Sequence, residues 1–185
     1  MVDQLTEGEA KENSLKVRLD NASKARSVIQ HVAQKTQANL EYHISHLISL
    51  ALASVWSEPY DFSVKFVQRR NKTECDLKFI RDGEECDPIE AAGGGACDVA
   101  SFALQVAYLT MKRVRKTMIL DEPFAFLHSP SLQRNCSEMV RTLCDKLKIQ
   151  IIMVSDQDDI TTYAHKHFKV RLLNKVSMVE EKDNG

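Results

Sequence analysis

Two adjacent carboxylates at the end of an apolar run are the residues of this 185-residue chain that are best suited to chemistry. Asp121 and Glu122 follow the apolar run at 117–120 and precede Pro123. A buried strand there would carry both carboxylates to its C-terminal edge. One carboxylate can hold Mg²⁺ through water, and the next can polarise a water molecule that attacks a phosphate. The alternative is a strand end followed by an acidic turn, but the apolar run and Pro123 favour the chemical interpretation.

A glycine triplet, Gly93-Gly94-Gly95, precedes a segment with helical periodicity. Backbone amides at a helix N-terminus form an anion site when no side chain covers them. The triplet therefore predicts a phosphate contact, with a flexible loop as the alternative. The sequence contains no G-x-x-x-x-G-K-[ST] loop, which is the usual phosphate cradle of nucleotide-binding proteins. The chain therefore carries only half of a nucleotide site.

The hydrophobic pattern predicts the elements that must position these residues. Apolar residues recur at helical spacing from about Glu9 to Trp56, a stretch without proline, which predicts one long helix that is broken once at most. Its first half is narrow-striped and charged, like a short coiled-coil stub. Its second half, from about Leu40, is apolar enough to enter a core. An ordinary amphipathic helix packed along the domain is the alternative.

The rest of the chain alternates between strand and helix patterns. Alternating apolar and polar residues at 62–69 and 75–81 predict an antiparallel hairpin. Further along, the pattern predicts helices at about 98–112, 131–147 and 158–165, and strands at about 117–121, 150–155 and 168–173. Nearly continuous apolar strands that alternate with helices are typical of an α/β fold with parallel pairing.

The order of these features resembles the C-terminal lobe of the ATPase head in SMC and SbcC-type recombination ATPases of the ABC class. The triplet followed by Asp98-Val99-Ala100-Ser101, together with LDEPF at 120–124, is closest in style to phage-encoded members. The resemblance implies an α/β fold of parallel strands with flanking helices, plus a β-hairpin and a long N-terminal helix. It divides the chain into a helical coiled-coil-like stub (1–39), the head lobe (40–178) and a disordered tail (179–185).

The resemblance also implies roles for individual residues. Asp121 would be the Mg²⁺ ligand through water, and Glu122 would be the general base. Gly93, Gly94 and Gly95 match the signature motif that grips the γ-phosphate of ATP on an opposite head, but the usual hydroxyl and carboxylate are absent in either possible register. His128 stands where the D-loop usually has Asp, and Asp156 stands where the switch loop usually has His. An ionised carboxylate at 156 repels a phosphate, which argues against efficient hydrolysis.

Composition limits the partners. Lys and Arg total 25 and Asp and Glu total 26, so the formal net charge of −1 gives no overall attraction to nucleic acid or membrane. Basic clusters at 69–72, 112–116 and 166–171 are either solvated loop charge or, given the resemblance, phosphate contacts with DNA. Five scattered cysteines without a CxxC pair, no signal-peptide pattern and no membrane-spanning apolar run predict a cytoplasmic protein, in the host cytoplasm if phage-encoded.

Two hypotheses account for these features. In the first, the chain is the C-terminal half of a split or truncated recombination or repair ATPase head, and it uses ATP and Mg²⁺ only with a partner that supplies the phosphate loop. That partner would be an N-terminal ATPase lobe or a complete SMC-like ATPase, with DNA, a nuclease subunit or a second copy of the chain as further candidates. In the second, the chain is a non-catalytic remnant or mimic that binds and regulates or inhibits a repair ATPase or another partner.

Overall fold

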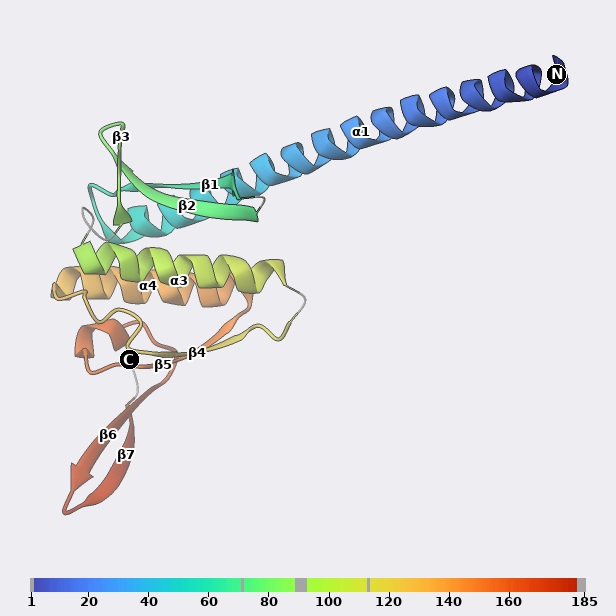
Figure 1. The fold of residues 1–185 in the computed structure, drawn as a ribbon. Coiled ribbons are helices and arrows are strands. Elements are labelled where there is room, and N and C mark those ends of the chain that lie inside the picture. Colours follow the sequence, from blue (N-terminus) through green and yellow to red (C-terminus); the bar gives the residue numbers. More distant parts are fainter. Residues whose placement is uncertain (1, 71, 89–92, 113, 183–185) are drawn as a thin grey trace. The chain divides into compact units, whose positions relative to one another are not determined.

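The computed structural model describes residues 2–70, 72–88, 93–112 and 114–182 (Figure 1). The chain divides into two compact units, residues 1–42 and 43–185. Helix α1 (Val2–Val55) runs through this division without a break, so the single long helix predicted from the sequence is confirmed. Among the helices that the structure describes, none combines the length and the apolar character that crossing a bilayer requires.

The first unit is the N-terminal part of α1. It presents an apolar stripe to solvent, in which Leu15, Leu19 and Ile29 are each more than half exposed. Charged side chains lie beside the stripe, and Lys16–Glu12 and Lys24–Asp20 form ion pairs one helical turn apart. An apolar stripe on a helix ordinarily packs against another part of a protein. The interpretation of this segment as part of a coiled coil stays a prediction.

The second unit begins with the C-terminal part of α1 and an antiparallel sheet of order β1-β2-β3. Strands β1 (Asp61–Arg69) and β2 (Lys72–Arg81) form the predicted hairpin, with Phe62 opposite Phe79. These two rings are buried and meet edge to face at 5.1 Å. The short strand β3 (Glu84–Cys86) was not predicted. It is reached through Asp82 and Gly83, both of positive φ, as a two-residue hairpin turn of type I′ requires.

Helix α1 covers the open edge of β1 through two serine side chains. The backbone N–H of Phe62 donates to Ser49 Oγ at 2.8 Å, and the N–H of Val64 donates to Ser45 Oγ at 2.9 Å. The serines are four residues apart on a helix and the amides two residues apart on a strand. Both separations are about 6 to 7 Å, so both hydrogen bonds can form together. These two amides of the edge strand are thereby satisfied without another strand.

Replacing Ser45 and Ser49 together by Ala is expected to lower the free energy of unfolding by about 2 kcal/mol, because two amides of buried residues lose their acceptors. Chemical denaturation of the full chain measures this. Ser54→Ala is the matched control, because within the described residues Ser54 Oγ bonds only its own helix at Ala51 O, and the change there is expected to be neutral. Equal stability of the double variant and the control would show that water replaces the serines at the sheet edge.

Two helices and two strands form the next part of the second unit. They are helices α3 (Gly93–Met111) and α4 (Pro130–Leu147) and strands β4 (Thr117–Asp121) and β5 (Gln150–Val154) (Figure 1). The two strands pair in parallel, with Asp121 opposite Val154. This confirms the predicted glycine-initiated helix, the second helix and the parallel pair. Residues such as Phe102 and Phe124, whose rings meet at 5.2 Å, fill the core here.

The predicted third parallel strand is wrong. After β5, the chain forms only a four-residue 3₁₀ helix, η1 (Asp158–Thr161), which is too short for the crossover of a dozen or more residues that a parallel strand needs. Strand β6 (His167–Leu173) instead pairs antiparallel with β7 (Val176–Lys182) through Asn174 and Lys175, both of positive φ. Residues 179–182 of the predicted disordered tail are therefore strand, because they pair with β6; residues 183–185 lie outside the described part.

Helix α4 ends at a residue whose type does not suit its backbone. Lys148, at the C-cap, has φ 53° and ψ 47°, the left-handed conformation that favours glycine. Lys148→Gly is expected to raise the free energy of unfolding by about 0.5–1 kcal/mol, because the strain removed exceeds the extra flexibility of glycine in the unfolded chain. Lys146→Gly, two residues earlier in the last turn of α4, is the control and is expected to lower stability by about 1 kcal/mol. A loss of stability in both variants would contradict this assignment.

Candidate functional site

The two predicted carboxylates lie at the C-terminal edge of the parallel pair. Asp121 is the last residue of β4 and is exposed. Glu122 follows with φ 44°, and its backbone N–H donates to Val154 O at 3.0 Å, which extends the contact between the strands by one residue. A non-glycine residue in this conformation is strained, and such strain is often found at functional sites.

Ser155 fixes the side chain of Glu122. Its hydroxyl donates to Glu122 Oε2 at 3.1 Å, and its Oγ accepts the backbone N–H of Gln157 at 3.2 Å. Sequence reasoning placed Ser155 only as the residue before position 156. The signal that could have identified it was topological: parallel neighbours end at one edge of a sheet, so the residue after β5 must lie near the residue after β4.

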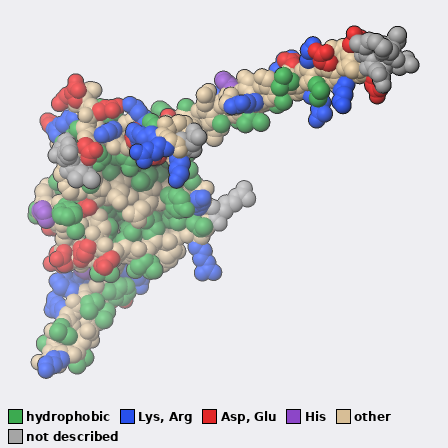
Figure 2. Space-filling model, in the orientation of Figure 1, with side chains coloured by type: hydrophobic (Ala, Val, Ile, Leu, Met, Phe, Trp, Pro, Cys, Tyr) green, Lys and Arg blue, Asp and Glu red, His purple; other side chains and the backbone are tan. Residues whose placement is uncertain are grey.

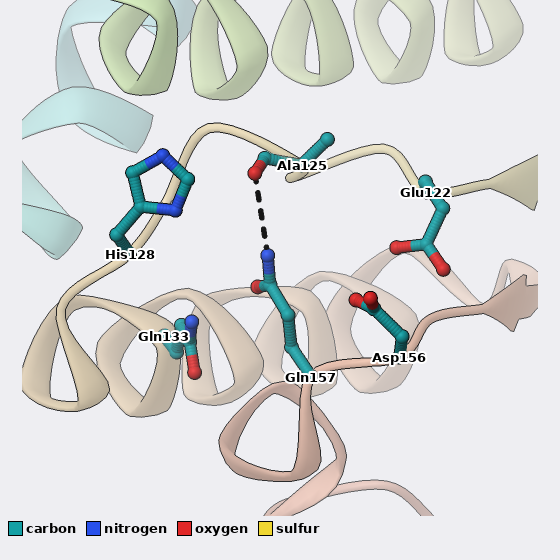
Figure 3. Close-up of a pocket in the computed structure, with 6 residues that line it drawn as sticks. All are labelled: Glu122, Ala125, His128, Gln133, Asp156 and Gln157. Carbon is teal, nitrogen blue, oxygen red and sulfur yellow. Dashed lines mark hydrogen bonds between the residues drawn. The ribbon is translucent and has the colours of Figure 1, made fainter.

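A pocket of about 460 Å³ opens beside Glu122 and is lined by Glu122, Ala125, His128, Gln133, Asp156 and Gln157 (Figure 3). It brings together three of the predicted site residues, Glu122, His128 and Asp156. In Figure 3 the two carboxylates lie at one side of the pocket and the His128 ring at the other, with Gln157 between them. Gln133 and Gln157 were missed, because a glutamine carries no chemical signal in the sequence.

The glycine triplet is not part of this pocket. Gly93 begins α3 with φ 73°. A β-carbon on Gly94 would lie 2.6 Å from Phe126 Cγ, and one on Gly95 would lie 3.2 Å from Phe126 O. The structure therefore gives these glycines a packing reason: they let the loop after Glu122 approach the first turn of α3. A phosphate contact by this turn remains a prediction.

Asp98 ties the same loop to α3. Its carboxylate accepts the backbone N–H of Phe126 at 2.9 Å. Burial raises the pKa of the Asp98 carboxyl above its usual range, and the hydrogen bond from Phe126 opposes this by favouring the charged form. The sequence pattern marks Asp98 only as the start of a helix. In the structure it links α3, which begins with the glycine triplet, to the loop that follows Glu122.

The carboxylates of the site are better suited to a metal ion that keeps some of its water ligands than to one bound by protein atoms alone. Carboxylate oxygens such as those of Asp121, Glu122 and Asp156 are what Mg²⁺ prefers. However, no three His, Cys, Asp or Glu side chains in the described ranges are grouped to hold a metal ion by themselves. A Mg²⁺ ion at this edge would need water and phosphate oxygens to complete its ligands. Among the six lining residues only His128 can carry positive charge, so a polyphosphate would need further cationic groups from elsewhere.

No family model matches the chain, and no curated protein matches it. Solved structures do resemble it. SMC ATPases studied for their ATP-driven dimerisation and DNA-stimulated activation match with a TM-score of 0.61 at 17% identity, over 79% of this chain and 87% of the other.

Two further structures have the same fold over less of their length. An SMC head bound to the C-terminal winged-helix domain of ScpA has a TM-score of 0.62 at 18% identity, over 78% of this chain and 44% of its own. The Pyrococcus furiosus Smc head with an extended coiled coil, bound to the C-terminal domain of ScpA, has a TM-score of 0.57 at 16% identity, over 94% and 45%. The chain therefore has an SMC-head-like fold and spans less than half of these two head structures.

Proposed function

We propose that this chain is the C-terminal half of an SMC-type ATPase head, which acts when a partner supplies the phosphate-binding loop and the missing strands. The observation that carries the proposal is the incomplete parallel sheet. In the described ranges β4 and β5 pair only with each other, whereas parallel sheets are ordinarily larger and covered on both faces. A partner that adds strands at the open edges would complete this sheet.

The uncovered face of this strand pair supports the same proposal. Met118 and Leu120 turn toward the core, whereas Ile119 on the opposite face is 77% exposed. Ile152, its direct neighbour across the pair, and Val154 at the strand end are also about half exposed or more. Each exposed aliphatic side chain that a partner buries contributes about 1.5–3 kcal/mol. The face is therefore suited to an apolar layer of a partner lobe.

The β6–β7 hairpin offers a further uncovered surface. Its alternation places Phe168, Val170 and Leu172 on one face, with Val179 opposite Val170, and all four are more than half exposed. Figure 2 shows apolar side chains along this hairpin. Two strands alone are marginally stable in water, so the hairpin is expected to gain stability when a partner covers it. We place a partner subunit of the head here or on the neighbouring sheet face.

Within such a complex, each predicted residue has a role that its position allows. Asp121 would hold Mg²⁺ through water, and Glu122, oriented by Ser155, would accept a proton from the attacking water. His128 would present its imidazole ring at the opposite side of the pocket. ATP with Mg²⁺ would supply the phosphate chemistry. DNA, which stimulates the SMC ATPases of similar fold, is proposed as the ligand of the assembled head, and a nuclease subunit or a second copy of the chain as further partners.

A non-catalytic docking protein is the second candidate. The observation that favours it is the pocket itself, because Asp156 adds a second carboxylate beside Glu122, and two negative charges oppose a phosphate there. In that case the same uncovered sheet face would bind a repair ATPase and regulate or inhibit it without turnover. The two candidates therefore share an interface and differ in chemistry.

ATP binding and turnover by the purified chain, alone and with the protein encoded beside it or an isolated N-terminal SMC lobe, separate the candidates. Turnover only in the mixture is the expected result. A stable complex without turnover would favour the docking protein. Turnover by the chain alone would contradict the proposal, because it would require a phosphate site within this chain.

A further inference from the structure

The loop after Glu122, residues 124–127, is held from two opposite sides. On the pocket side, Gln157 Nε2 donates to Phe124 O at 3.3 Å and to Ala125 O at 3.4 Å, and Gln133 Nε2 donates to Leu127 O at 2.6 Å. On the other side, the Phe126 N–H is bonded to Asp98, and the Phe126 side chain closes on Gly94. Every residue of this four-residue loop therefore contacts one side or the other.

We propose that this loop couples the pocket to the glycine turn of α3, and that Gln157 is the positioning residue that controls it. When Gln157 holds Phe124 and Ala125, Phe126 stays seated on Gly94. When an occupant of the pocket draws the Gln157 amide away, Phe126 is released and the glycine turn is uncovered. The functional meaning of this coupling rests on the proposed ATPase head, but the coupling itself is a property of this chain alone.

Gln157 is the link that changes most easily. Its two hydrogen bonds, at 3.3 and 3.4 Å, are longer than the usual N–H···O range, whereas the Gln133 bond at 2.6 Å is short. Its Oε1 is buried and has no hydrogen-bond partner among the described residues. A buried acceptor without a donor is unfavourable, so a donor group in the pocket would reorient this amide. Gln133, buried in α4 at 8% exposure, is the fixed end of the loop.

Glu122 is joined to the same network. Ser155 bonds both the Glu122 carboxylate and the Gln157 backbone N–H. A ligand or water that changes the position of the Glu122 side chain therefore acts on the segment that carries Gln157. This gives a continuous chain of contacts from the proposed general base to the glycine turn. Spatial continuity alone does not demonstrate coupling, so the test must measure one end while the other is changed.

The six glycines of the chain make this measurement direct. With ¹⁵N-glycine labelling, the full chain gives few resonances, and the Phe126 ring shifts that of Gly94 because of its magnetic anisotropy. Phe126→Ala marks the position of the uncovered Gly94 resonance. Gln157→Glu keeps the side-chain size but turns an oxygen toward the two carbonyls. We expect it to move the Gly94 resonance most of the way to the Phe126→Ala position, while Gly8 and Gly83 stay unchanged.

Three further variants make the result decisive. Gln105→Glu, on the exposed surface of α3, is the charge-matched control and should leave Gly94 in place. Ser155→Ala disturbs Gln157 from the other side and should move Gly94 in the same direction, and it also serves if Gln157→Glu does not fold. An unmoved Gly94 resonance in folded Gln157→Glu would overturn the proposal. Movement in Gln133→Glu alone would also overturn it, because the controlling residue would then be Gln133. A failure of ATP turnover would leave these resonances unaffected, so the two proposals can fail separately.

Discussion

Glu122→Gln is expected to reduce ATP turnover by the reconstituted complex by about 100- to 10,000-fold, the usual contribution of a general base. The amide cannot accept a proton from water at neutral pH. Its oxygen can still accept the hydrogen bond from Ser155 Oγ, so the side chain should keep its place. ATP affinity of the complex and the stability of the chain should therefore change little. Steady-state turnover together with nucleotide binding measures both parts of this expectation.

A matched variant separates the chemical role of Glu122 from its charge. Glu138, which is exposed on α4, can be changed to Gln with the same loss of one negative charge, and turnover should be unaffected. Unchanged turnover in Glu122→Gln would remove the general-base assignment. Unchanged turnover in that variant, with a complex that still forms, would leave Asp156 as the carboxylate of the pocket to be tested next.

Ile119→Asp is expected to weaken binding of the phosphate-loop partner by about 1,000-fold or more, which corresponds to roughly 4 kcal/mol. The complex loses a buried aliphatic contact and must bury a carboxylate instead. In the free chain Ile119 is 77% exposed, so the free energy of unfolding of the chain alone should change by less than about 0.5 kcal/mol. A titration by calorimetry, with denaturation of the free chain, gives both values.

The control for this variant is another exposed apolar residue with no place on the proposed interface. Met111, at the end of α3, is 55% exposed, and Met111→Asp should leave the affinity unchanged. Equal weakening by the two variants would point to a nonspecific effect of the added charge. No weakening by Ile119→Asp would show that the outer face of β4 and β5 is not where the partner binds.

Elements with local signals could be predicted from the sequence. The hairpin of β1 and β2 alternates apolar and polar residues over most of its length, and α3 and α4 have clear periodicity. Strand β6 was located correctly but given the wrong partner, because apolar residues identify a strand without saying what it pairs with. The pairing depended on the turn at Asn174 and Lys175, which lacks the glycine that ordinarily marks such a turn.

The residues of the site likewise divide into those with a signal in the sequence and those that only the folded structure reveals. The resemblance to ATPase heads implied that Glu122, His128 and Asp156 belong to one site, and all three line one pocket. The roles of Gln133, Gln157 and Ser155 depend on hydrogen bonds to backbone atoms of a distant loop, which no residue pattern encodes. The glycine triplet was read as a phosphate contact, whereas the close approach of Phe126 to Gly94 supplies a reason that only the packed structure shows.

The serine pair that covers β1 also fixes the position of α1 along that strand. Four residues of helix advance about 6.0 Å and two residues of strand about 6.4–6.8 Å. Each further serine–amide pair along the two elements would therefore be out of register by roughly another half ångström. Two neighbouring hydrogen bonds tolerate this mismatch, whereas a longer series would accumulate it. A turn of α1 by one residue would carry Ser45 and Ser49 away from Val64 and Phe62 at once. Rotation of the helix about its axis therefore breaks both hydrogen bonds together, so the serine pair holds α1 at one angle against the edge of the sheet.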